Sequence, residues 1–189
     1  MLLERLIISS KNGIIRDIPF KLQGLNLIID TTPISENSTI SGNNVGKTTF
    51  LRSIDFCFGS DGKDIYVDKE NKTDNDLVKR FLVENEVTFA LSLLYKDSKR
   101  TILRRSFSST NDLMIDETKY ENISSYRKKI LDLLFHISAS ESKISLRDII
   151  KKFVRSDLFS ESNLLRILHT SKKDSAYEAM YLFLFGFPN

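Results

Sequence analysis

The chain has 189 residues, of which 41% are hydrophobic and 28% are charged. This balance predicts a folded domain with a real core and excludes a disordered chain. The formal net charge of +3 is too small to indicate nucleic-acid binding by itself. Glu4 and Arg5 interrupt the N-terminal apolar stretch, unlike a signal peptide, and no apolar run approaches the roughly 18 residues that cross a bilayer. With a single cysteine, Cys57, in an apolar run, we expect a cytoplasmic protein without membrane contact.

The first thirty residues predict short strands. An apolar run over residues 2–8 is separated from a second run, over 14–22, by an Asn-Gly turn signal at 12–13. Pro19 in the second run predicts an edge strand or a bulge. Residues 25–30 read LNLIID, a near-continuous apolar run that is typical of a buried strand.

The middle of the chain begins with a predicted helix over residues 48–58, whose apolar side chains share one side. Gly59 is its expected C-terminal cap, and a charged excursion follows over 60–76. Alternating apolar residues and a KDSK turn then predict strands. These strands cover residues 87–95, 101–107 and 113–116.

The final third changes to a helical pattern. Apolar residues at spacings of three and four predict helices over 126–137 and 146–154. Ser145, with Asp148 three residues later, begins the second of these much as a capping box does. Two further helices are expected, over residues 163–169 and 174–185.

The stretch from Ser41 to Thr49, SGNNVGKTT, nearly matches a phosphate-binding loop. In such a loop, backbone N–H groups surround the β-phosphate at the start of a helix. A lysine reaches the β and γ oxygens, and the following hydroxyl binds magnesium. Lys47 is therefore the predicted catalytic residue and Thr48 the predicted Mg²⁺ ligand. The residues expected to hold ATP are Gly42, Asn43, Asn44, Val45, Gly46, Lys47, Thr48 and Thr49.

Ser41 departs from the loop pattern, which has glycine at this position. A left-handed conformation there would disfavour serine, whereas Asn43 and Asn44 tolerate unusual φ angles. The loop keeps its shape if its turn shifts to Gly42. The alternative is a Gly-Lys-Thr helix start that binds no ligand, but the apolar run before the loop and the apolar-faced helix after it favour a working site.

With its flanks, the loop resembles the N-terminal half of ABC-type ATPase heads of the chromosome-maintenance and recombination-repair kind. Asn26 and Ile28 match the strand pattern N-x-I-x-G of those heads. Asn43, Gly46, Lys47 and Thr48 match their loop pattern, G-x-N-x-x-G-K-[ST]. The extra loop at 31–39 and the runs IDFCFGSD (54–61) and SLRDIIKKFVR (145–155) resemble a bacterial subfamily with a C-terminal domain of unknown function.

The resemblance implies an α/β fold, a P-loop NTPase of ABC-ATPase type whose N-terminal lobe has a mixed β-sheet and an appended helical region. Residues 1–123 would form the ATPase lobe, and residues 124–189 would lead toward a coiled coil or second lobe. Such heads hydrolyse ATP with Mg²⁺ between two copies, using Walker B acids and a Ser-Gly-Gly signature from a C-terminal lobe. This chain has no Ser-Gly-Gly, and its only glutamine, Gln23, precedes the loop. The implied partners are that lobe, a second head and DNA, in DNA repair or defence against mobile elements.

Two alternatives come from the residues themselves. The run LMIDE (113–117) resembles a Walker B end, in which Asp116 would hold magnesium through water and Glu117 would polarise the attacking water. That interpretation gives a self-sufficient P-loop kinase or GTPase, whereas the simpler one is an exposed hairpin strand. The second alternative is a non-catalytic interaction module with a vestigial loop. The apolar run at 179–187 predicts either a patch that another surface covers or packing on the domain's own core.

Overall fold

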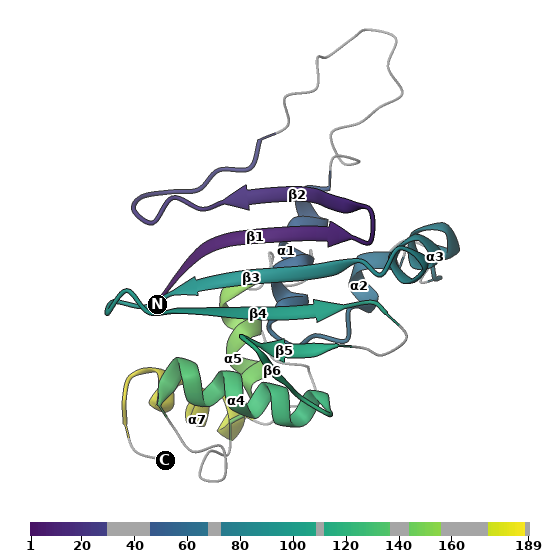
Figure 1. The fold of residues 1–189 in the computed structure, drawn as a ribbon. Coiled ribbons are helices and arrows are strands. Elements are labelled where there is room, and N and C mark those ends of the chain that lie inside the picture. Colours follow the sequence, from purple (N-terminus) through teal and green to yellow (C-terminus); the bar gives the residue numbers. More distant parts are fainter. Residues whose placement is uncertain (30–45, 68–72, 109–111, 137–143, 156–173, 188–189) are drawn as a thin grey trace, which may run out of the picture.

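The computed structural model describes residues 1–29, 46–67, 73–108, 112–136, 144–155 and 174–187. Within them, six strands form one sheet in the order β2-β1-β3-β4-β5-β6 (Figure 1). The strands are β1 (Leu2–Ser10), β2 (Gly13–Pro19), β3 (Thr88–Leu94), β4 (Arg100–Ser106), β5 (Leu113–Ile115) and β6 (Thr118–Lys119). Every neighbouring pair is antiparallel, so the described sheet is not the mixed sheet that we expected.

The described helices are α1 (Lys47–Cys57), α2 (Lys63–Tyr66), α3 (Asp76–Glu84), α4 (Ile123–Phe135), α5 (Leu146–Phe153) and α7 (Asp174–Leu184). The helices expected near residues 48, 126, 146 and 174 are confirmed, and the helix expected over 163–169 lies outside the described residues. Helix α3 was not predicted from the sequence. Its N-cap is Asn75, whose side chain accepts a hydrogen bond from the Val78 amide at 3.2 Å.

One row of buried side chains shows how the sheet builds its core. It consists of Leu6, Leu91, Leu103 and Ile115, which pair in succession from β1 to β5. Phe89, on the same face of β3, packs edge-on against Phe56 of α1 with ring centroids 5.4 Å apart. Burying each such side chain stabilises the fold by about 2 kcal/mol. Figure 1 shows α1 behind the sheet, with α4 and α7 beyond β5 and β6.

Both expectations for the N-terminal hairpin are confirmed. Strand β1 turns into β2 at the predicted Asn-Gly site, with Ser10 paired to Gly13. Pro19 is the last residue of β2, which is an edge strand of the sheet. This is a position where the missing N–H of proline leaves no gap in the ladder.

The buried strand expected over residues 25–30 is a wrong prediction for residues 25–29, and Asp30 lies outside the described part. These five residues form no strand, and Leu25 and Leu27 are each 73% exposed. The sheet ends at β2, so no described strand lies beside the segment to pair with its backbone groups. An apolar run becomes a buried strand only when neighbouring strands cover it.

The C-terminal helices pack on the same core as the sheet. Tyr126 and Ile130 of α4 are buried in the cluster that contains the sheet leucines, and Ile149 of α5 belongs to it as well. In the apolar run at 179–187, Phe183 is buried against this core, which confirms core packing in part, whereas Phe187 is exposed, and its cover by another surface stays a prediction. The division of the chain at residue 123 stays a prediction. None of the helices in the described ranges is long and apolar enough to cross a membrane.

Candidate functional site

The predicted phosphate-binding residues fall partly within the described structure, at the start of α1. Gly42, Asn43, Asn44 and Val45 lie outside the described residues. Gly46 is the N-cap of α1 and adopts a left-handed conformation, with φ 80° and ψ 14°. Glycine adopts this conformation without the steric cost that a Cβ atom imposes.

The first turn of α1 is open to a ligand. No side chain caps it, it contains no acidic residue, and Gly46, Lys47, Thr48 and Thr49 are all exposed. The first helical hydrogen bond runs from the Phe50 amide to the Gly46 carbonyl at 2.9 Å. The amides of residues 47–49 therefore have no partner within the helix. Free N–H groups and the positive end of the helix dipole favour an anion at this point.

A cavity of about 610 Å³ lies beside this turn. Lys47 and Thr49 of α1 line one side of it, and Arg16 of β2 lines another. The remaining lining is mainly aliphatic and includes residues 27–29. The structure shows no hydrogen bond or ion pair for Lys47 among the described residues. Among the described residues, the Lys47 ammonium group is therefore without a partner, and it lies next to a space large enough for a small ligand.

The opposite end of α1 is closed by backbone hydrogen bonds. The Ser60 amide donates to the Asp55 carbonyl at 3.2 Å, and the Gly59 amide donates to the Phe56 carbonyl at 2.9 Å. These two bonds form a Schellman motif, and Gly59 has the left-handed φ of 90° that the motif requires. The expected C-terminal cap at Gly59 is thus confirmed.

Side chains from three other elements bind the carbonyl groups at this end. Arg105 of β4 donates to the carbonyls of Phe56 and Ser60, both at 2.6 Å, and its guanidinium stacks on the Phe56 ring at 3.9 Å. Burial lowers the pKa of Arg105 to about 10, which still leaves it protonated at neutral pH. Its positive charge faces the negative end of the helix dipole.

Helix α4 contributes the next two contacts. The Tyr126 hydroxyl donates to the Cys57 carbonyl at 2.8 Å, and Arg127 Nε donates to the Gly59 carbonyl at 2.8 Å. Tyr126 is fully buried, so its hydroxyl needs a partner of this kind. We call Arg105, Tyr126, Arg127 and Arg147 together the anchor of α1.

Helix α5 supplies the last member of the anchor. Arg147 binds the Asp55 carboxylate through both terminal nitrogens, with Nη1–Oδ1 and Nη2–Oδ2 distances of 2.7 Å. Both side chains are largely buried, with 16% and 10% exposure for Arg147 and Asp55. This pair joins residues 92 positions apart in the sequence. Asp55 and Arg147 lie in the two runs that resemble the bacterial subfamily, 54–61 and 145–155, but nothing in the sequence predicts that they pair.

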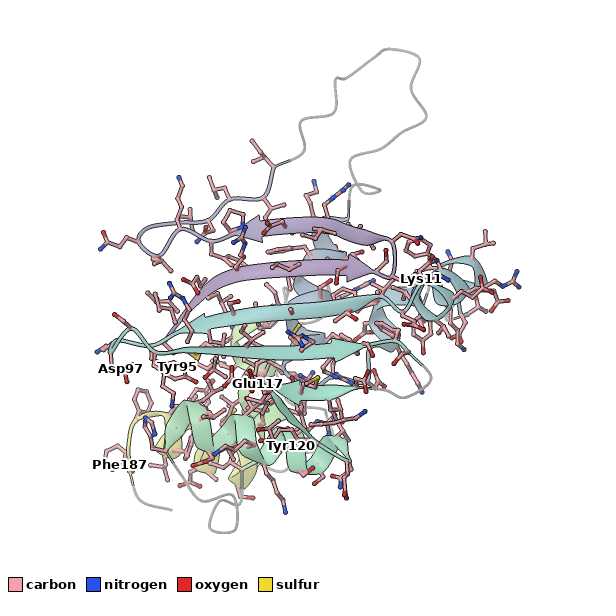
Figure 2. All side chains as sticks on the ribbon, in the orientation of Figure 1. Lys11, Tyr95, Asp97, Glu117, Tyr120 and Phe187 are labelled. Atoms are coloured by element: carbon pink, nitrogen blue, oxygen red, sulfur yellow. The ribbon has the colours of Figure 1, made fainter. Side chains whose placement is uncertain are left out.

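Asp116 and Glu117 occupy the turn between β5 and β6, where Ile115 pairs with Thr118 (Figure 2). Asp116 Oδ1 accepts a hydrogen bond from the Ile102 amide at 2.7 Å, and the Asp116 amide donates to the Ile102 carbonyl at 2.8 Å. The hairpin part of the simpler interpretation of this run is therefore confirmed, but Leu113 and Ile115 in its strand are buried rather than exposed. Three strand spacings, or roughly 14 Å of sheet, separate β5 from β1, which borders the cavity beside Lys47.

In the described part of the chain, no group of three or more His, Cys, Asp or Glu side chains could hold a metal ion. The one predicted magnesium ligand, Thr48, is exposed in the open turn of α1. Comparison of the chain with models of known protein families and with curated proteins finds no match. The geometry at the two ends of α1 therefore carries the functional argument.

Proposed function

We propose that the chain binds Mg²⁺-ATP at the N-terminus of α1, as the N-terminal lobe of an ABC-type ATPase. One observation carries the proposal: α1 begins at a left-handed glycine, and its first turn has amides without intrahelical partners and a Lys47 that no other described residue pairs, beside a cavity. Triphosphates are bound by groups of this kind, because backbone N–H donors and a lysine together neutralise their charge. Thr48 would hold the Mg²⁺ that bridges the β and γ oxygens.

The exposed segment 25–29 supports the second part of the proposal, a missing lobe. Leu27 and Ile28 border the 610 Å³ cavity and also a second cavity of about 430 Å³. Phe50 of α1 borders both cavities as well. An exposed apolar segment beside the second cavity suits a strand that gains a neighbour from another lobe, while the 610 Å³ cavity on its other side borders Lys47. The chain alone would then bind nucleotide with negligible turnover.

A kinase or GTPase that works alone is the weaker candidate. It needs Asp116 as the magnesium acid, yet both the amide and the carboxylate of Asp116 bind Ile102 in the sheet. DNA as a partner rests on the resemblance alone, since Arg5, Lys79 and Arg100 each bind a carboxylate of their own chain.

The test is a calorimetric titration of the full chain with Mg²⁺-ATP, together with a phosphate-release assay. We expect wild-type binding, loss of binding in Lys47→Ala by at least about tenfold, and no release above background. Lys63→Ala is the matched control, because Lys63 also follows a left-handed glycine at a helix start but lies in the four-residue α2. Absence of Mg²⁺-dependent binding at millimolar ATP would favour the vestigial-loop alternative. Turnover by the chain alone that is lost in Asp116→Asn would favour the kinase or GTPase.

A further inference from the structure

The two ends of α1 differ in what holds them in place. At the N-terminal end, residues 46–49 are exposed, and no side chain caps the helix. At the C-terminal end, the anchor binds the carbonyls of residues 56, 57, 59 and 60 and the carboxylate of Asp55. Phe50 packs against Phe20 near the open end, so the position of this end depends on that packing and on the hydrogen bonds made at the other end.

Helix geometry gives the size of the displacement that a change at the anchor would cause at the first turn. Helix α1 has 11 residues and so is about 16 Å long. A tilt of about 5° at the anchor would move the first turn by about 1.4 Å. Binding sites that hold phosphate groups through several directed hydrogen bonds lose function on displacements of this size.

Within the anchor, the pair of Arg147 and Asp55 is best placed to set the tilt. Arg105 and Tyr126 bind backbone carbonyls from the interior of the fold. Arg147 binds the Asp55 carboxylate of α1 in a bidentate geometry, which fixes direction as well as distance, and also donates to the Asp55 carbonyl at 3.4 Å. Helix α5 itself is held firmly, since Ser145 caps it and Ile149 is fully buried.

We propose that Arg147 is a positioning residue for the nucleotide site, acting through Asp55 on the axis of α1. This inference rests on the proposed function for its ligand, but its mechanical part concerns the chain without ligand. Arg147 lies about a hundred residues after the phosphate-binding loop in the sequence. The helical region after the sheet would thus help to fix the position of the nucleotide site, and it would not be an independent appendage.

The first arm of the test measures the Mg²⁺-ATP dissociation constant of the full chain at a temperature where circular dichroism shows every variant to be folded. We expect Arg147→Met to weaken Mg²⁺-ATP binding about tenfold. Arg147→Lys keeps the positive charge but loses the two parallel guanidinium donors, so it should weaken binding less. Adding Asp55→Asn to Arg147→Met should change little more, because the two residues act as one pair. A purely stabilising role would leave the affinity of the folded protein unchanged.

The second arm uses no nucleotide. Backbone amide chemical shifts of residues 46–50 are compared by NMR between the wild type and Arg147→Met or, if that variant does not fold, Arg147→Lys. These amides lie about 7.5 to 13.5 Å from Asp55 along the helix, so their movement would report a tilt rather than a local change. The matched control is Arg5→Met, which breaks another bidentate Arg–carboxylate pair, with Asp17, in the β1–β2 hairpin.

The two arms separate the two ways of failing. If the wild type binds no Mg²⁺-ATP, the proposed function fails, and the chemical shifts alone decide whether Arg147 positions the first turn. The positioning role is overturned by a different result. In that case the wild type binds Mg²⁺-ATP, and Arg147→Met has the same Mg²⁺-ATP affinity and the same chemical shifts at residues 46–50 as the control Arg5→Met. Shifts that move without a change in affinity would also overturn it for the nucleotide site.

Discussion

Helix α1 presents two contrasting ends. Its N-terminal turn shows free amides, Lys47 and Thr48 to solvent, with an aliphatic cavity beside it. Its C-terminal turn ends in a Schellman motif and accepts hydrogen bonds from three arginines and a buried tyrosine hydroxyl. At its C-terminal end, the carbonyls of residues 55–57, 59 and 60 each accept a hydrogen bond, whereas at its N-terminal end the first amides have no partner within the helix. That asymmetry is what a helix needs if it is to be fixed in place and still bind an anion.

The largest effect should come from breaking the closed end in the core. We expect Arg105→Met to lower the free energy of unfolding by about 3 kcal/mol, because the Ser60 carbonyl loses its side-chain donor inside the fold and the Phe56 carbonyl keeps only the Gly59 amide. Urea denaturation measures the change. Arg104→Met is the matched control, since Arg104 is the neighbouring residue in β4 but is exposed. Equal effects of the two substitutions would contradict the structural role of Arg105.

A smaller effect should follow from removing one hydroxyl of the anchor. Tyr126→Phe deletes the donor to the Cys57 carbonyl, and we expect a loss of about 1–2 kcal/mol in unfolding free energy. Tyr120→Phe serves as the control, because Tyr120 packs against the Tyr126 ring and the structure shows no hydrogen bond to its hydroxyl within the described residues. If denaturation midpoints fall by the same amount in both variants, the hydroxyl contact contributes nothing specific.

The smallest effect concerns pH and the thiol at the closed end. Burial raises the pKa of Cys57 from its ordinary value of 9.0 to about 12, so the thiol stays protonated in the folded chain. The folded-state pKa lies above the unfolded one, so the contribution to stability is complete below pH 9 and is lost as pH rises from about 9 toward about 12. Between pH 8 and pH 10, the wild type should lose about 1 kcal/mol more than Cys57→Ala. Identical pH slopes for the two proteins would show that Cys57 is not buried as described.

Local pattern was enough to predict most of the elements that the structure describes. The alternation at 87–95 places Phe89, Leu91 and Leu93 on one face, and these side chains are buried. The spacing of three and four after Ser145 predicts α5, and the Ser145 hydroxyl accepts from the Asp148 amide as a cap. Such signals act within one turn or one strand and need no knowledge of the rest of the chain.

The features that sequence reasoning missed depend on distant partners. The run at 25–30 has the composition of a buried strand, but burial requires neighbours that the described sheet does not supply. The Arg147–Asp55 pair and the Arg105 contacts join residues between 45 and 92 positions apart, which no periodicity reveals. One signal was available: Arg105 falls on the inward face of its strand, in step with Leu103, and a buried arginine needs acceptors.

In the candidate site too, the local feature was predictable from the sequence, whereas the features that depend on distant partners were not. The Gly-Lys-Thr sequence predicts a helix start, and the structure has one at Lys47, with a left-handed Gly46 as its N-cap that the sequence analysis did not predict. The ligand, the Mg²⁺ ion and the second lobe are not local properties, so they stay predictions. They depend on how free donors, an unpaired lysine and an exposed apolar segment are used once partners are present.

A crystal structure of the full chain with Mg²⁺ and a non-hydrolysable ATP analogue tests the central claim most directly. We predict that the β-phosphate accepts hydrogen bonds from the amides at the start of α1, with Lys47 on the β and γ oxygens and Thr48 on the metal ion. An analogue bound elsewhere, or a first turn of α1 occupied by groups of the protein itself, would contradict the account.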